Sequence, residues 1–112
     1  MEAILQEIKE ELVRQREKWG EQNHPFHDQT LLNRKGGCSP KRMCSNYEIP
    51  SETRARQLYD TAAKRGEVTW MHILQEEVSE ACSEFNEEAL KKELIQIAAV
   101  CVSAVESIER GL

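Results

Sequence analysis

Apolar residues recur at intervals of three and four along most of the chain, which is the spacing of amphipathic helices. One such stripe covers residues 1–18 and another covers residues 52–65, with charged residues at the positions between. A third runs over residues 70–85 and a fourth over residues 87–108. No segment alternates with the period of two that is typical of strands. The pattern therefore predicts an all-α fold of four helices.

Capping residues mark where these helices begin and end. Ser51, Thr69 and Asn86 each stand just before an apolar stripe and can accept hydrogen bonds from the first backbone N–H groups of a helix. Gly20 and Gly66 follow the first two stripes and suit helix ends. The connections between the last three helices are short, so we expect the third and fourth helices to run antiparallel, side by side.

Several residues of the last two helices are expected in the core. Trp70 lies at the start of the apolar stripe of the third helix and is expected to pack in the core. Cys82 and Cys101 fall within predicted helices and are interpreted as small core residues. His72 is interpreted as a structural or surface residue.

A stretch from about residue 24 to residue 50 shows neither the periodicity of helices nor that of strands. Gly36, Gly37, Pro40 and Pro50 interrupt it. Loops of this length in compact domains are usually functional or disordered, so the stretch is predicted to be a long loop that serves either as a substrate lid or as an insertion.

Part of this loop, residues 33–45, is basic and contains no acidic residue. It can attract a polyphosphate, or it can simply be a solvated, flexible loop. Cys38 and Cys44 lie in the same part, and with His24 and His27 upstream they could bind zinc, although their spacing matches no common zinc finger. The four basic residues of segment 33–45 are Arg34, Lys35, Lys41 and Arg42.

Composition limits the classes of protein to consider. A chain of 112 residues forms one domain, residues 1–112, and 39% hydrophobic with 31% charged residues fits an ordered, helix-rich protein. The net charge of −5 argues against nucleic acid as a partner, because phosphate backbones are bound mainly through Lys and Arg. A short bundle leaves apolar surface exposed, so a homodimer or homotetramer is expected.

The location of the protein is predicted from two kinds of segment that the sequence does not show, a signal peptide and a membrane-spanning stretch. Residues 1–7 have neither the basic flank nor the apolar run of a signal peptide, and residues 94–105 are too short an apolar stretch to cross a membrane. The four cysteines are then expected to be free thiols. We expect the protein in the cytoplasm, or in the host cytoplasm if it is viral.

Two acidic stretches carry the candidate chemistry. Glu77 and Glu80 lie about 60° apart on the third helix and border its apolar stripe. Glu93 and Gln96 border the apolar face of the fourth helix in the same way. If the two helices face each other, three carboxylates and an amide converge. Glu76 points to a slightly different side.

Unpaired carboxylates in such a position are unfavourable, because like charges repel and burial removes their hydration. A divalent cation removes the problem, and oxygen ligands of this kind select Mg²⁺. Such a site suits phosphoryl chemistry, in which Glu76 can orient or deprotonate a water molecule. The alternative is a solvated acidic face paired with Lys91, Lys92 or Arg65.

Substrate contacts are predicted from two further groups of residues. Trp19 can stack on a base, while Asn23 reads the edge of that base, Lys18 meets a phosphate and His24 lies beside them. A tryptophan near a helix end is more often a core residue, and this alternative stays open. The second helix offers candidate phosphate ligands that can equally form a solvated basic face. They are Arg54, Arg56, Lys64 and Arg65.

The motif of Glu76-Glu77-x-x-Glu80 followed by Glu93-x-x-Gln96 resembles the EExxE and ExxD signature of the MazG-like, all-α nucleoside triphosphate pyrophosphohydrolases. Residues 14–25, 69–74 and 93–100 are similar to the matching segments of a small subgroup found in bacteria and phages. The resemblance covers most of the chain except the long loop.

This resemblance implies a four-helix MazG-like bundle completed by oligomerisation. It implies cleavage of a (d)NTP between its α and β phosphates, giving the (d)NMP and pyrophosphate, with Mg²⁺, or Mn²⁺ in its place. By carry-over, Glu77, Glu80 and Glu93 are metal ligands and Glu76 assists. The sequence does not select the base; a purine dNTP such as dGTP or dATP is one candidate, since a tryptophan stacks on any base.

Gln96 stands where the family has a ligating aspartate. Its amide oxygen can coordinate a metal as a fourth ligand but brings no charge, so the site holds fewer ions, holds them more weakly, or relies on substrate phosphates. The alternative function is a non-catalytic helical interaction or regulatory protein on the same scaffold, which Gln96 and the basic loop favour.

Overall fold

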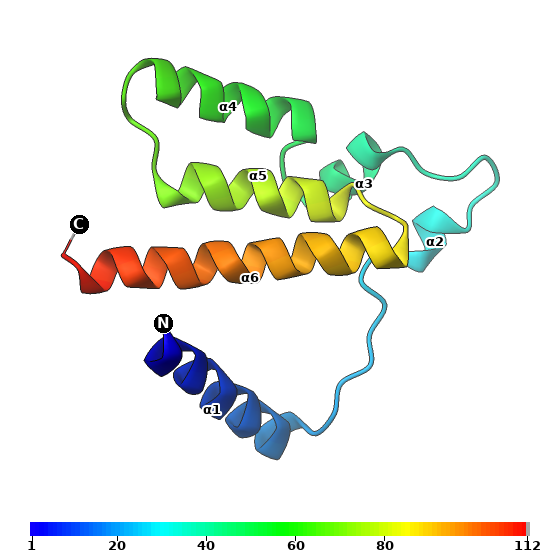
Figure 1. Ribbon diagram of the computed structural model, residues 1–112. Coiled ribbons are helices and arrows are strands. Elements are labelled where there is room, and N and C mark those ends of the chain that lie inside the picture. The colour runs from blue at the N-terminus through cyan, green and yellow to red at the C-terminus, as the bar shows by residue number, and fades with distance from the viewer. Residues whose placement is uncertain (112) are drawn as a thin grey trace.

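A computed structural model describes residues 1–111, and this part of the chain contains six helices and no strand. The prediction of an all-α fold is confirmed. The four predicted helices correspond to the first and the last three of the six. Their bounds are α1 Glu2–Trp19, α2 Gln29–Leu32, α3 Pro40–Asn46, α4 Glu52–Lys64, α5 Trp70–Cys82 and α6 Glu87–Glu109 (Figure 1).

Local capping sets the starts of α4, α5 and α6 as the sequence predicted. The side chains of Ser51, Thr69 and Asn86 each accept a hydrogen bond from a backbone N–H of the first turn. His72 completes a capping box, because its Nδ1 accepts a hydrogen bond of 3.0 Å from the backbone N–H of Thr69. His72 is therefore structural.

The long loop predicted for residues 24–50 is wrong in part, because it contains α2 and α3. These helices have four and seven residues, too few turns to show a periodicity. Their start signals are nevertheless present: Asp28 and Ser39 accept hydrogen bonds from the N–H groups that follow, and Pro40 occupies the first position of α3. The stretch is thus a folded part of the domain.

The main apolar cluster joins this stretch to the C-terminal end of α5. Met43 and Cys44 of α3 are fully buried against Cys82. His27 is also buried, with its Nε2 3.1 Å from the backbone oxygen of Cys82 and its ring edge-on to Phe85. The partly buried residues around this cluster are Leu31, Leu32, Cys38, Ile49 and Phe85.

Helices α4, α5 and α6 lie side by side with α5 in the middle, and α5 and α6 run antiparallel as predicted (Figure 1). Small residues allow close approach along α4 and α5, where Ala55, Ala62 and Ala81 are buried. Ser79 is buried between them and its hydroxyl donates a 2.9 Å hydrogen bond to the backbone oxygen of Pro50. This packing sets the register in which acidic residues of α5 meet α4.

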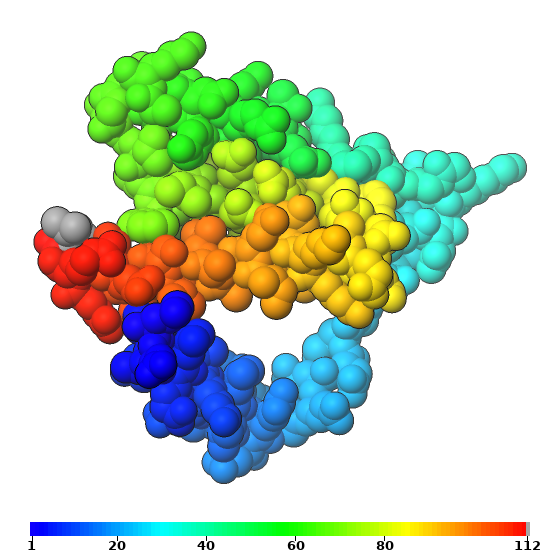
Figure 2. All heavy atoms as spheres, in the orientation of Figure 1, coloured from blue at the N-terminus to red at the C-terminus, as the bar shows by residue number. Residues whose placement is uncertain are grey.

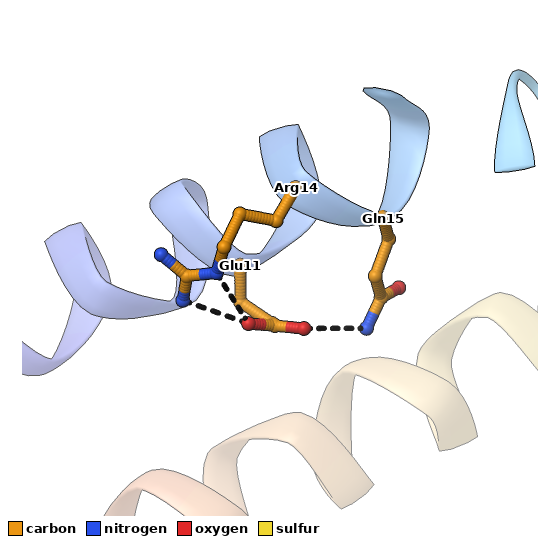
Figure 3. Close-up of polar contacts among 3 residues, drawn as sticks. All are labelled: Glu11, Arg14 and Gln15. Atoms are coloured by element: carbon orange, nitrogen blue, oxygen red, sulfur yellow. Dashed lines mark hydrogen bonds and ion pairs between the residues drawn. The ribbon is translucent and has the colours of Figure 1, made fainter. Parts of the chain in front are cut away.

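Helix α1 is poorly attached to the rest of the chain. Only Ile4 among its residues is buried. An opening separates the rest of α1 from the middle of α6 in the space-filling view (Figure 2). On α1 itself, Glu11 binds Arg14 at 2.7 Å and Gln15 at 3.3 Å, contacts that stay within the helix (Figure 3). Its apolar residues Leu5, Ile8, Leu12 and Val13 are each 43–49% exposed.

Helix α6 is also incompletely covered. Ile95 and Ile108 are 70% and 71% exposed, and Cys101 is exposed, so its prediction as a core residue is wrong. Trp70, at 38% exposed, is not in the core of this chain either. A helix with apolar residues on several sides is usually covered on several sides. None of the helices in residues 1–111 combines the length and the apolar character that crossing a bilayer requires.

The whole chain is open for its mass. Its accessible surface is 8552 Å², whereas a compact monomer of 12.9 kDa exposes about 6,300 Å². Its radius of gyration is 16.4 Å, whereas about 13 Å is typical of a compact domain of this length. Roughly 2,200 Å² of surface is thus exposed beyond the compact expectation.

Candidate metal site between α5 and α6

An acidic group forms where α5 faces α6. The short turn after α5 returns the chain antiparallel, and this places Glu77 and Glu80 of α5 opposite Glu93 of α6. One carboxylate oxygen from each lies within 4.8 Å of the others, and all three residues are half-buried. Within residues 1–111 no other group of His, Cys, Asp or Glu side chains converges in this way. The predicted convergence of these three glutamates is therefore present.

Crowding of these carboxylates changes their protonation. Burial raises the pKa of Glu80 from 4.5 to about 7, with further contributions from the charges of Glu77 and Glu93 and from a hydrogen bond to Glu93. Burial, then the charges of Glu93 and Glu76, also raises the pKa of Glu77. Below pH 7 the acidic group is therefore expected to retain a proton when no other cation is bound.

Gln96 stands beside this group as the sequence predicted. With its amide nitrogen turned towards the acids, it donates hydrogen bonds of 3.2 Å to Oε2 of Glu77 and to Oε2 of Glu93. The amide thus joins the two helices across the site. The opposite orientation presents the amide oxygen, which is the atom that can coordinate a metal.

Glu76 faces α4 and is not one of the three converging acids. Its Oε1 is 3.6 Å from Nε of Arg56, and the same guanidinium reaches Oε1 of Glu80 at 4.0 Å through Nη2. The cations expected as partners of an acidic face were Lys91, Lys92 and Arg65, but Lys91 binds Glu88 instead. The cation at this site comes from α4.

A cleft of about 410 Å³ opens next to the acids, between α4 and α5. Tyr59 and Asp60 of α4 line it and were not among the predicted site residues. The sequence signal for them was weak: they follow Arg56 by three and four positions on one helix, but only the register between α4 and α5 shows that this side meets the acids. The remaining lining residues are Arg56, Ile73, Glu76 and Glu77.

The donor set fits a hard divalent cation. Three carboxylates and one amide offer only oxygen ligands, which Mg²⁺ and Mn²⁺ prefer, and these ions offset the burial of charge and the repulsion that together raise the pKa of Glu80. Glu77, Glu80 and Glu93 are the residues that would hold the ion, with Gln96 as a neutral fourth ligand. Glu76 remains outside this set.

Other predicted substrate residues do not line this cleft. Lys18 and Trp19 are exposed at the C-terminal end of α1, Asn23 and His24 are exposed in the segment that follows it, and Lys64 is exposed in the last turn of α4. Trp19 is 62% exposed, so it is not a core residue of this chain, and Nζ of Lys18 lies 4.8 Å from the centre of its ring. Their role in substrate binding stays a prediction.

The zinc alternative in the loop finds no support in the described residues, where Cys38, Cys44, His24 and His27 form no convergent group. Cys44 is buried in the apolar cluster. In the basic segment, Lys41 lines a separate cleft of about 620 Å³ together with Arg54 at the start of α4.

Metal-free protein should lose stability as the pH rises from 5.5 to 8. The pKa of Glu80 is raised to about 7 in the folded chain, so between pH 4.5 and 7 the folded chain holds a proton that the unfolded chain has released. The expected loss is on the order of 1 kcal/mol after allowance for solvent screening, or a few degrees in Tm. Thermal unfolding with a chelator present measures it.

The control for this pH effect is Glu80→Gln, which removes the titrating group but keeps the shape of the side chain. Most of the difference in Tm between pH 5.5 and 8 should disappear in this variant. A wild-type chain that is equally stable, or more stable, at pH 8 contradicts the prediction.

No protein-family model matches the chain, and searches of curated proteins and of solved structures give no match. The resemblance to MazG-like enzymes therefore rests on the sequence motif and the similar segments described above.

Proposed function

We propose that the chain is a Mg²⁺-dependent, MazG-like nucleoside triphosphate pyrophosphohydrolase that converts a (d)NTP into the (d)NMP and pyrophosphate. One observation carries the proposal: the carboxylates of Glu77, Glu80 and Glu93 converge from two helices. Holding three acids so close is costly unless a cation joins them. The same residues form the motif that resembles the signature of that family.

The residues around the acids have separate roles in this reaction. Bound Mg²⁺ would neutralise phosphate oxygens and lower the pKa of a water molecule. Glu76 lies outside the ligand set and can accept a proton from the water that attacks the α phosphorus. Its carboxylate contacts Arg56 at 3.6 Å, and both residues line the neighbouring cleft.

The adjoining cleft supplies space for substrate. Its volume of about 410 Å³ is within the range typical of small-ligand sites. Tyr59 offers an aromatic face to a base, and Arg56 offers a planar cation to phosphate oxygens. We propose the cytoplasm as the location of this activity, which the free state of all four cysteines and the need for a nucleotide pool support.

A second copy of this chain is the proposed cover for α1 and α6. The surface in excess of a compact monomer, roughly 2,200 Å², exceeds the 800 Å² or so that each partner buries in a standard interface. The exposed residues of α1 and α6 include several large apolar side chains, among them Leu5, Ile8 and Ile95, and apolar residues are enriched in homodimer interfaces. We propose a homodimer, or a homotetramer built from dimers.

The second candidate is a non-catalytic interaction or regulatory protein on the same helical scaffold. It is favoured by Gln96, whose amide can satisfy Glu77 and Glu93 at 3.2 Å without any metal. Acidic residues that are hydrogen-bonded in this way keep their positions without a bound ion.

Turnover separates the two candidates. The protein is incubated with each of the eight common NTPs and dNTPs and Mg²⁺, and pyrophosphate and monophosphate are measured. We expect equal amounts of both products from at least one substrate, with purine dNTPs such as dGTP and dATP tested first. No product from any nucleotide at pH 6 to 9, with Tm unchanged on adding Mg²⁺ and nucleotide, contradicts the enzyme proposal.

A further inference from the structure

Arg56 is the one cation that contacts the acids of the site within residues 1–111. Its guanidinium spans Glu76 and Glu80 at 3.6 Å and 4.0 Å, and its side chain is 62% exposed. The same residue lines the cleft next to the acids. It therefore stands at the boundary between the acidic group and the space available to a ligand.

We propose that Arg56 acts as a replaceable counter-ion: it partly neutralises the acidic group when no divalent cation is bound, is displaced when a cation binds, and then turns into the adjoining cleft to contact the triphosphate. The first half of the proposal concerns cation binding alone. The second half rests on the proposed function.

The geometry makes Arg56 a weak competitor for this position. Both of its contacts lie near the upper limit for an ion pair, and an exposed pair of this kind contributes little to stability. A divalent cation carries twice the charge and approaches carboxylate oxygens to about 2.1 Å. Exchange therefore favours the ion.

The short path into the cleft makes the same side chain available to substrate. The stem of Arg56 is held at α4, but its exposed guanidinium has no contacts besides Glu76 and Glu80 in the described residues. A divalent cation reduces the negative charge that holds the guanidinium, and a triphosphate bound in the cleft brings new negative charge to the other side. Arg56 then changes partners without movement of the helix.

This exchange predicts two opposite effects from one substitution. Arg56→Gln removes a competing positive charge, so the affinity for a divalent cation should rise roughly threefold to tenfold. An arginine that helped to build the metal site would give the reverse result. Arg54→Gln is the matched control, because it removes the same charge from the same helix at an exposed residue that does not contact the acids.

Mn²⁺ binding to chelator-treated protein, followed by electron paramagnetic resonance or calorimetry at pH 8 and low salt, measures the first effect. We expect tighter binding by Arg56→Gln and a change within about twofold for Arg54→Gln. Equal or weaker binding by Arg56→Gln, or an equal gain in both variants, overturns the exchange. A wild-type chain that binds no Mn²⁺ overturns both the exchange and the site.

Turnover tests the second effect separately. If the wild-type chain releases pyrophosphate, Arg56→Gln at saturating Mg²⁺ should lower kcat/KM about tenfold or more despite its higher metal affinity. An unchanged kcat/KM overturns the contact with the triphosphate but leaves the exchange standing. If the wild-type chain releases none while Arg56→Gln still gains Mn²⁺ affinity, the proposed function fails and the counter-ion role remains.

Discussion

Replacing Glu80 by glutamine should lower kcat/KM for pyrophosphate release by about 10²–10³-fold or more, and Glu77→Ala and Glu80→Ala should abolish it. In the proposed ligand set, the three carboxylates supply all of the negative charge, because Gln96 supplies none. Loss of one leaves two charged ligands for a dication that must also bind phosphate oxygens. The effect should be larger than in a site with a fourth carboxylate.

These substitutions should not unfold the chain. Burial and the charges of Glu77 and Glu93 raise the pKa of Glu80. A neutral side chain at this position therefore relieves repulsion. Metal-free Glu80→Gln is therefore expected to be as stable as the wild-type chain at pH 8, or more stable. Lost activity with a retained Tm separates a lost ligand from a lost fold.

Steady-state kinetics with Mg²⁺ and the best nucleotide, together with circular dichroism, measures both quantities. Glu88→Gln is the matched control, because its side chain is 79% exposed at the start of α6 and contacts only Lys91 among the described residues. It should keep full activity. If Glu77→Ala and Glu80→Ala both remain fully active, the assignment of the site is wrong.

Sequence periodicity was sufficient for the parts of the fold that depend on single helices. It predicted α1, α4, α5 and α6 and the caps at Ser51, Thr69 and Asn86, because both signals are local. It also predicted the approach of Glu77, Glu80 and Glu93, since a short turn forces two helices to run antiparallel. Helices α2 and α3 were missed because neither is long enough to show a repeating apolar pattern.

Contacts that depend on the register between helices were not accessible from the sequence. Arg56 meets Glu76 and Glu80 because buried small residues, Ala55 and Ser79 among them, bring α4 close to α5. No pattern within α4 specifies that register. The same limit applies to Tyr59 and Asp60, which are recognisable as site residues only beside the acids.

The wrong core predictions have a different cause. Trp70 and Cys101 lie on apolar stripes, and a stripe shows that a surface avoids water without showing which chain covers it. In this chain both residues are exposed. Apolar positions that fail as core residues of one copy are the positions to test as contacts between copies.

Ile8→Glu should therefore convert an oligomer into a monomer. Ile8 is 43% exposed in the single chain, where a surface substitution usually changes stability by no more than about 0.5 kcal/mol. If a second copy covers α1, the same substitution buries an unpaired carboxylate in an apolar interface, which is strongly unfavourable. We expect the dissociation constant of the oligomer to rise about a hundredfold or more.

Ala3→Glu is the matched control for this substitution. It adds the same charge to the same helix, five residues earlier and about 140° around the axis, on the charged side of α1. Sedimentation velocity across a range of protein concentrations should show Ile8→Glu as a monomer while Ala3→Glu and the wild-type chain remain associated. A wild-type chain that is monomeric at high concentration contradicts the proposal that a second copy covers α1 and α6. If all three chains associate alike, a second copy is present but does not cover α1 at Ile8.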